Sequence, residues 1–264
     1  MNAIEYEKLN RLDRGHWFYR GKRAIVRYWI ERFLPLGPED VLIDAGTGTG
    51  TWPVEMSGVC RVIGLDDHAE SIAIARPRLE AVGGRVVQTT LDRLDLPDGT
   101  AAVTTALDVL EHLDDDRAAL RELIRVTRPG GLVVLTVPAL RWLWSDWDVT
   151  LHHRRRYHRA DLLALVSQPE VEVLHCAYIN SAALLPIVLV RLWRRFFPPR
   201  PGAERAEDRL PSRPVNALLY HAFVRPACWR WFRPPAGGSL LAVLRVKPAP
   251  LTTANGKMAA ASAP

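Results

Sequence analysis

The sequence has few cysteines, and those it has form no recognisable set. Only Cys60, Cys176 and Cys228 occur in 264 residues. Their number is odd, and neither a Cys-x-x-Cys pair nor a zinc-ligand spacing is present, so the pattern predicts no disulfide framework and no structural zinc site. Free thiols are typical of a reducing compartment, and we therefore expect a cytoplasmic protein.

Long apolar runs are also missing. Charged residues throughout positions 1–17 leave no apolar core of the kind a secretory leader needs, so we expect no export. The most apolar stretch, Ala182 to Val190, contains Pro186 and ends at Arg191, far short of the roughly 20 residues that span a bilayer. The sequence therefore predicts no transmembrane helix.

Charge is present but unevenly distributed. The net charge is +6, and residues 141–233 hold 15 arginines against 8 acidic residues, which leaves the rest of the chain close to neutral. This asymmetry concerns what the region touches more than how it folds. Because the arginines alternate with strongly apolar pieces and no nucleic-acid module is recognisable, nucleic acid is not expected as a partner. No pattern indicates an oligomeric state.

Short apolar segments alternate with helical ones, in a chain that is 48% apolar and can bury one substantial core. This alternation predicts an α/β fold with a doubly wound, mostly parallel seven-stranded sheet and a helical insertion before the last strand. Helices are expected near 52–58, 69–82, 115–127 and 159–167. The expected strands are 41–45, 61–66, 85–90, 101–108, 132–138, 171–178 and 239–246.

The expected organisation follows from these elements. An N-terminal segment that is expected to be helical over 4–34 precedes the core, and a tail rich in Ala, Pro and Thr is expected to be disordered. The predicted units are 1–37 (N-terminal segment), 38–179 (core), 180–237 (helical insertion), 238–247 (last strand) and 248–264 (tail).

A glycine-rich turn follows the first expected strand. The run DAGTGTG, Asp44 to Gly50, has the spacing G-x-G-x-G, and glycines there let a ligand lie against the backbone. The spacing falls short of the dinucleotide fingerprint, and Asp44 would repel phosphates but attract an ammonium group. Asp66, which ends the second strand, lies where a carboxylate accepts ribose hydroxyls; the alternative is a helix N-cap.

Four segments in the same order resemble the class I S-adenosylmethionine (SAM)-dependent methyltransferases, in the group with a Glu-His pair after the fourth strand, similar to methyltransferase types 11 and 23. They are DAGTGTG, LDD, ALDVLEHL and LIRVTRPGGLVVLTVP, within residues 41–138. The resemblance implies a Rossmann-like sheet that binds SAM as cofactor. The family often has an Asp after the third strand that meets the adenine amino group, and Thr90 stands there in this chain. The Thr90 hydroxyl, a backbone group or Asp92 would make that contact instead. The implied cofactor positions are Asp44, Ala45, Gly46, Thr47, Gly48, Gly50, Asp66, Asp67, Thr90, Leu91 and Asp108.

Candidate catalytic groups follow the fourth and fifth strands, whose carboxyl ends meet at one edge of a parallel sheet. His112 and His153 are the candidate bases, although the Glu-His pair can also serve to shape the cofactor pocket. The acids and histidines show no dedicated ligand spacing, so no metal site is expected. The predicted acceptor-binding residues are Trp144, Arg155, Arg156 and Tyr157, the arginines being suited to a phosphate or carboxylate.

We therefore expect a SAM-dependent methyltransferase that acts on a small-molecule or lipid-like acceptor, at oxygen. Transfer to carbon or nitrogen on the same fold is an alternative. An NAD-linked oxidoreductase is disfavoured by the glycine spacing and by the absence of a Tyr-x-x-x-Lys pair at Tyr157. The third alternative is a membrane-peripheral protein that binds SAM but catalyses no reaction.

Residues 180–237 are expected to cap the acceptor site and to rest on a membrane surface. The run Ala182 to Val190 leads to Arg191, Arg194 and Arg195 with aromatic residues among them, a pattern typical of an interfacial helix. The alternative is an ordinary buried helix pair with a solvated arginine edge.

Overall fold

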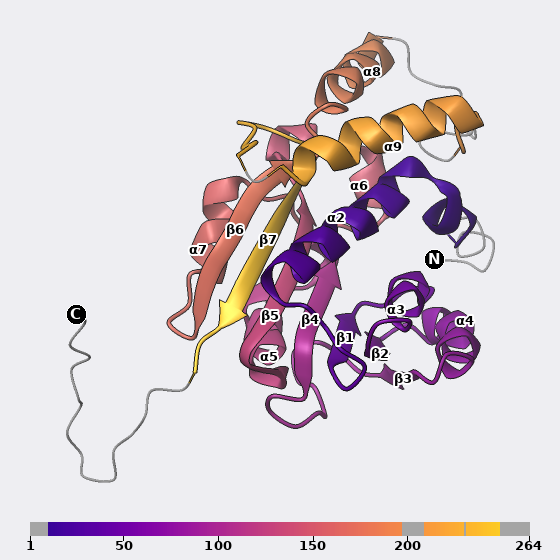
Figure 1. Ribbon diagram of the computed structural model, residues 1–264. Coiled ribbons are helices and arrows are strands. Elements are labelled where there is room, and N and C mark those ends of the chain that lie inside the picture. Colours follow the sequence, from indigo (N-terminus) through magenta and orange to yellow (C-terminus); the bar gives the residue numbers. More distant parts are fainter. Residues whose placement is uncertain (1–9, 197–208, 230, 249–264) are drawn as a thin grey trace.

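The computed structural model describes residues 10–196, 209–229 and 231–248. Its framework is one seven-stranded sheet in the order β3-β2-β1-β4-β5-β7-β6 (Figure 1), which confirms the predicted fold class. Residues 249–264 of the predicted tail lie outside the described residues. The strands are β1 (Val41–Ala45), β2 (Arg61–Asp66), β3 (Arg85–Gln88), β4 (Ala101–Leu107), β5 (Thr127–Pro138), β6 (Val171–Ile179) and β7 (Ser239–Val246).

The strand directions bring the ends of many strands to one edge. β1 to β5 pair in parallel, whereas β7 is antiparallel to both of its neighbours, β5 and β6. β6 therefore runs in the same direction as β5. The loops that follow β1, β2, β4, β5 and β6 all begin at this carboxyl edge, where open α/β sheets place their ligands.

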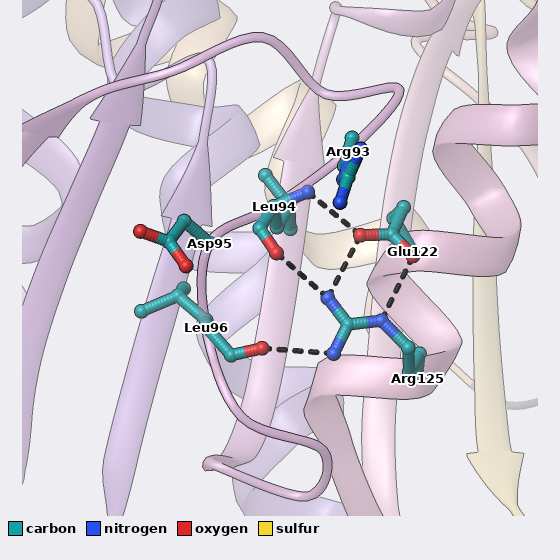
Figure 2. A pocket seen from close by; sticks show the side chains of 6 residues that line it. All are labelled: Arg93, Leu94, Asp95, Leu96, Glu122 and Arg125. Atoms are coloured by element: carbon teal, nitrogen blue, oxygen red, sulfur yellow. Dashed lines mark hydrogen bonds and ion pairs between the residues drawn. The ribbon is translucent and has the colours of Figure 1, made fainter.

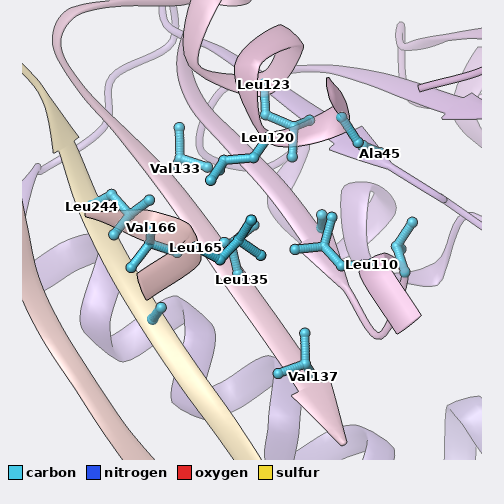
Figure 3. Close-up of a cluster of buried hydrophobic side chains, with 14 of the residues drawn as sticks. Ala45, Leu110, Leu120, Leu123, Val133, Leu135, Val137, Leu165, Val166 and Leu244 are labelled. Atoms are coloured by element: carbon cyan, nitrogen blue, oxygen red, sulfur yellow. The ribbon is translucent and has the colours of Figure 1, made fainter. Parts of the chain in front are cut away.

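Two helices cover one face of the sheet, α5 (Asp116–Val126) and α7 (Arg159–Val166). α5 begins where the side chain of Asp115 accepts a hydrogen bond from the backbone N–H of Ala118 at 2.8 Å, which is an N-cap. Its apolar positions are spaced so that they share one side of the helix and are buried on the strands. Figure 3 shows this cluster, in which Leu120 and Leu123 of α5 lie with Val133 and Leu135 of β5.

The opposite face is covered by α2 (Trp17–Phe33) and α3 (Thr51–Met56). Ile25, Val26 and Trp29 of α2 are buried in this layer. α4 (Ala69–Glu80) packs beside β3 in a smaller cluster. The described part of the segment expected to be helical, residues 10–34, divides at His16. The side chain of His16 accepts a hydrogen bond from the N–H of Phe18, and a new helix, α2, begins there.

Between β6 and β7 the chain forms α8 (Leu184–Phe196) and α9 (Arg213–Ala227), so the predicted insertion before the last strand contains helices. α9 lies alongside α2 (Figure 1). The side-chain oxygen of Asn216 accepts a hydrogen bond from the N–H of Trp17 at 2.9 Å, and the Trp29 indole donates to the carbonyl of Ala227 at 3.0 Å. None of the helices in the described ranges is long and apolar enough to cross a membrane.

A surface hollow lies near the amino end of β4 and does not contribute to the carboxyl edge. Figure 2 shows that the guanidinium of Arg125, on α5, fills its centre and donates to the carbonyls of Leu94 and Leu96 at 2.8 Å each. Glu122 accepts from the same guanidinium and from the N–H of Leu94. Because these polar groups are paired with one another, they hold the loop before β4 in place.

Candidate functional site

The backbone at the carboxyl edge of the sheet is strained. Among the described residues, four that are not glycine have a positive φ, which costs a side chain about 1–3 kcal/mol. They are Asp108 after β4, Leu140 and His152 after β5, and Asn180 after β6. Such strain persists where the surrounding structure holds it, and it gathers at functional sites. All four positions lie in loops that start from this one edge.

The glycine-rich loop between β1 and α3 combines tight packing with one open position. A Cβ on Gly46 would lie 2.4 Å from Val109, and one on Gly50 would lie 2.6 Å from Leu79, so these two glycines allow close packing. Thr47 packs over Gly64 of β2, where an added Cβ would lie 2.9 Å from it. Gly48 also has a positive φ, but no atom lies within 4 Å of where its Cβ would be. Of Gly46, Gly48 and Gly50, Gly48 is therefore the one at which the backbone of the loop is open to close approach.

Asp66, at the end of β2, holds this loop through its carboxylate. It is buried, and its two oxygens accept hydrogen bonds from the N–H of Gly48 at 2.8 Å and of His68 at 3.0 Å. The N-cap of α4 is His68, so the alternative role of Asp66 as that cap is not what the structure shows. Each carboxylate oxygen can accept more than one hydrogen bond, and Asp66 retains acceptor capacity for hydroxyl groups.

Asp44 lies under the same loop at the end of β1. Burial raises its pKa to about 7, although the hydroxyl of Thr105 donates to it at 2.7 Å and favours the charged form. Thr105 in turn accepts from the indole of Trp52 at 3.1 Å. A carboxylate raised in pKa by burial gains much from a cationic partner. Ala45, next in β1, is fully buried in the core.

The loop after β3 carries the predicted adenine contacts. Thr90 is exposed, Leu91 is buried in the core beside it, and Asp92 is exposed. A hydrogen bond from the Thr90 hydroxyl lowers the pKa of Asp92. Asp67 is exposed and contacts the ring of His68 at 2.5 Å. These residues lie beside β2, and their contact with a cofactor stays a prediction.

Asp108 directly follows β4, and its partner Lys22 was not predicted from the sequence. Its carboxylate accepts from the hydroxyl of Thr136 at 3.0 Å and forms an ion pair with Lys22 of α2. Lys22 is buried, and its ammonium lies 4.4 Å from the centre of the Phe18 ring. Burial lowers the pKa of Lys22 to about 7, against the attraction of Glu111. The sequence does contain a sign that Lys22 is buried, because Lys22 lies on the same side of α2 as the apolar residues Ile25 and Trp29.

Glu111, His112 and His153 come together next to this pair, although His153 lies 41 positions beyond His112. Glu111 and His112 form the short helix η1 (Leu110–His112), and His153 follows α6 (Asp146–Thr150). The Nε2 of His153 lies 4.0 Å from a carboxylate oxygen of Glu111, and the two imidazole centres are 4.8 Å apart. Burial raises the pKa of Glu111 to about 8 and lowers that of His112 to about 4.

Asp148 of α6 orients His153 and is held by Arg156. Its carboxylate lies 2.9 Å from Nδ1 of His153 and forms a two-point ion pair with the buried guanidinium of Arg156, at 2.7 and 3.1 Å. Burial alone would raise the pKa of Asp148, but the hydrogen bonds from His153 and Arg156 outweigh it and lower the pKa to about 2. Arg156 also donates to the carbonyl of Ala139.

The structure gives two of the other predicted acceptor residues, Arg155 and Tyr157, internal partners. Arg155 donates to the carbonyls of Leu113 and Asp114 and to the carboxylate of Asp116. Tyr157 is buried and donates to the same carboxylate at 2.7 Å. Trp144 is exposed over 42% of its surface. With Arg156, these contacts build the wall of the site, and direct binding of an acceptor by any of them stays a prediction.

Comparison with known proteins agrees with this geometry. Residues 43–135, which contain the glycine-rich loop, Asp66, Asp108 and the Glu-His pair, match the family model described as a methyltransferase domain. This part of the chain is therefore similar to methyltransferase domains, as its sequence motifs predict. The match agrees with SAM as the expected cofactor.

Several curated relatives carry such methyltransferase names. A probable SAM-dependent methyltransferase of Mycolicibacterium smegmatis is 33% identical over 164 residues, 61% of this chain and 61% of its own. A demethylmenaquinone methyltransferase of Thermus thermophilus is 36% identical over 52% of this chain and 62% of its own. A malonyl-[acyl-carrier protein] O-methyltransferase of Serratia marcescens is 33% identical over 49% and 53%. The chain thus spans less than two thirds of the length of these relatives.

Solved methyltransferases share the fold over more of the chain. The complex between the Haloferax volcanii Trm112 methyltransferase activator and the putative methyltransferase contains a chain that is 19% identical, with a TM-score of 0.62 over 93% of this chain and 96% of that one. A geranyl diphosphate methyltransferase in complex with SAM is 16% identical, with a TM-score of 0.60 over 85% of both chains. At this identity the likeness shows the methyltransferase fold alone.

Proposed function

We propose that the protein transfers the methyl group of SAM to an oxygen atom of a lipid-like acceptor. The observation that carries the proposal is the loop at Gly48, where a left-handed glycine faces open space between two buried carboxylates, Asp44 and Asp66. The match of residues 43–135 to the methyltransferase domain supports the same cofactor.

The two carboxylates suit the two ends of this cofactor. Asp44 would hold the ammonium group of the methionine end, which supplies the cation that its buried carboxylate lacks. Asp66 would accept hydrogen bonds from the ribose hydroxyls while it keeps the N–H groups of Gly48 and His68. Gly48 allows the backbone to approach the ligand without a Cβ in the way.

The acceptor is expected to lie at the same carboxyl edge of the sheet, by the loops after β4 and β5. In methyl transfer an acceptor oxygen attacks the methyl carbon, the carbon–sulfur bond breaks, and its electron pair returns to sulfur to give S-adenosylhomocysteine. The hydroxyl proton must leave as the new bond forms. His153 is the imidazole best oriented for this, because Asp148 fixes Nδ1 and Nε2 faces Glu111. The name of the Serratia marcescens relative, an O-methyltransferase, favours oxygen.

A lipid-like acceptor is favoured by the exposed surface of α8 and α9. Leu185, Leu189 and Trp193 on α8 and Leu218 on α9 each expose more than half of their surface. Neither helix contains an acidic residue. Exposed apolar side chains on a basic segment are typical of helices that lie at the boundary of anionic lipid, where an amphiphilic acceptor would be found.

The test is a transfer assay with methyl-labelled SAM over a panel of amphiphilic hydroxyl compounds, with and without vesicles. We expect label to pass to at least one acceptor as an alkali-stable methyl ether. His153→Ala should lower turnover on the order of 10²-fold while SAM affinity stays within a few-fold of the wild type. His175→Ala is the control, since His175 is equally buried but stacks on Trp29 in the layer below α2.

The outcomes separate the alternatives. Label found on carbon or nitrogen would contradict oxygen transfer but retain the methyltransferase. Tight SAM binding with no transfer to any acceptor class would favour a SAM-binding protein without catalysis. Binding of NAD in place of SAM would overturn the proposal altogether.

A further inference from the structure

Glu111 is a buried acid whose carboxylate oxygens accept no hydrogen bond from the described residues. Its side chain is fully buried. A carboxylate removed from water without hydrogen bonds or a counter-ion is costly by several kcal/mol. Glu111 lies in the loop after β4, three positions beyond the strained Asp108, so this is an unfilled requirement at the carboxyl edge of the sheet.

The neighbouring cations are already engaged. Lys22 forms its ion pair with Asp108, and Arg156 forms its two-point pair with Asp148. Each of these cations is therefore matched by a carboxylate other than Glu111. The groups that do lie against Glu111 are the imidazoles of His112 and His153. One ligand atom from each of the three residues lies within 4.8 Å of the other two.

The orientation of His153 is that of a metal ligand. Histidines that bind metals commonly donate their second N–H to a carboxylate, which fixes the ring and its tautomer. Here Nδ1 of His153 lies 2.9 Å from Asp148, and Nε2 is directed toward Glu111. Asp148 is itself held by Arg156, so the ring is supported through two successive contacts.

We propose that Glu111, His112 and His153 bind a divalent first-row metal ion. One carboxylate and two imidazoles form a ligand set suited to Zn²⁺, Co²⁺ or Mn²⁺, with positions left open for an outside ligand. Ligands about 2.1 Å from an ion lie about 3–3.5 Å from one another, so the three side chains move inward by about 1 Å on loading. The site was not expected from the sequence because its third ligand comes from a separate loop.

A second cluster of possible ligands does not carry the same argument. Asp66, Asp67 and His68 also gather within 4.8 Å, but Asp67 and His68 are exposed. The oxygens of Asp66 already accept two backbone N–H groups. This cluster provides a useful internal control, because Asp67 and His68 place a carboxylate and an imidazole on the surface.

The ion would deepen the function proposed above, and this consequence rests on that function. It would take an acceptor oxygen as its outside ligand and lower the pKa of that hydroxyl, so that the proton leaves to water. His153 would then act as a ligand and not as the base. The acceptor class would be one whose oxygen can bind a cation, such as a hydroxyl next to a phosphate or a carbonyl.

Metal binding is tested on the full chain without any acceptor. Chelator-treated protein is titrated with Co²⁺ and, separately, Zn²⁺, and followed by calorimetry and by the visible absorption of bound Co²⁺. We expect one ion per chain with bands typical of nitrogen and oxygen ligands. Glu111→Gln and His153→Asn should each weaken binding by at least tenfold. His152→Asn and His68→Asn, which remove exposed imidazoles nearby, should not change it.

Circular dichroism and SAM titration accompany each variant. A variant that keeps its fold and its SAM affinity but loses the ion supports the metal site, whether or not any acceptor is methylated. The proposal is overturned if the wild type binds no ion beyond the level of a Glu111→Gln, His153→Asn double variant. It is equally overturned if His68→Asn removes the ion and Glu111→Gln does not. Loss of SAM binding in the metal-free wild type would instead count against the function proposed for the Gly48 loop.

Discussion

Gly48 and Gly83 have a similar backbone conformation, but only Gly48 lies in the proposed cofactor loop. Both have a positive φ, and an added Cβ would meet no atom within 4 Å at either position. Alanine should therefore cost about 1–2 kcal/mol in the free energy of unfolding at each, from the left-handed conformation alone. Only Gly48→Ala should also lower SAM affinity, by tenfold or more, because its methyl group enters the cofactor's space. Chemical unfolding and calorimetry measure the two effects, and equal SAM affinity in the two variants would contradict the placement of SAM.

Asp44 links cofactor binding to pH. Its raised pKa means that the folded chain holds a proton that the unfolded chain releases above its ordinary pKa near 4, so stability falls as the pH rises toward 7. Asp44→Asn removes this charge and should raise the stability of the SAM-free protein at pH 8 by on the order of 1–3 kcal/mol. At pH 5 the wild-type group is largely protonated, and the gain should shrink. The same variant should bind SAM at least tenfold more weakly at pH 8. Thermal unfolding of the wild type and the variant at pH 5 and pH 8 measures this gain in stability. A gain that is the same at both pH values would contradict a raised pKa of Asp44.

Single residues differ in how far the sequence predicts them. Gly46, Gly48 and Gly50 follow from the spacing of one loop, since only glycine suits that backbone. Lys22 does not, because its role depends on Asp108, a partner distant in the chain, and the role of Asp148 depends on a buried ion pair with Arg156 that spacing alone does not show. The same holds for the predicted acceptor residues Arg155 and Arg156. The sequence shows that they are charged, but it does not show that each already forms an ion pair with a carboxylate of this chain.

The segment between β5 and α7 is held by one buried ion pair. Arg156→Ala would leave Asp148 buried without its counter-ion, and such a loss costs about 3–5 kcal/mol. Arg154→Ala removes an exposed ion pair with Asp114 and should cost less than about 1 kcal/mol. Urea unfolding of the two variants measures the difference. Similar losses would show that Arg156 does not stabilise this segment, and would favour its predicted role in binding an acceptor.

α8 and α9 carry the predicted membrane contact. We expect the chain to float with vesicles that contain anionic lipid at low salt and to dissociate in high salt, because salt screens the attraction. Changing Arg191, Arg194 and Arg195 to Glu should abolish flotation. The matched control changes three exposed arginines of α4 and α5, Arg76, Arg117 and Arg121, to Glu. If both variants lose flotation equally, the net charge of the protein, and not α8 and α9, explains the binding. If the wild type does not float, the predicted membrane contact is contradicted.

At the scale of the whole molecule, the sequence predicts the sheet well. Strands such as β1 and β7 are buried on both faces, and their continuous apolar runs between turn residues are legible in one dimension. The break at His16 and the short helices η1 and α6 were not predicted, because they depend on single caps and on tertiary contacts and not on periodicity. Those unpredicted pieces carry Glu111, His112 and Asp148, so the acceptor side of the site is where sequence reasoning ends.

The central claim, that this fold holds SAM between Asp44 and Asp66, is tested most directly by calorimetric titration of the full chain. SAM and S-adenosylhomocysteine should each bind one per chain, NAD should not bind, and Asp66→Ala should weaken SAM by about 1.5–3 kcal/mol while the protein stays folded, since hydrogen bonds to a charged acceptor are lost. Binding of NAD without SAM, or an unchanged SAM affinity in folded Asp66→Ala, would contradict the account.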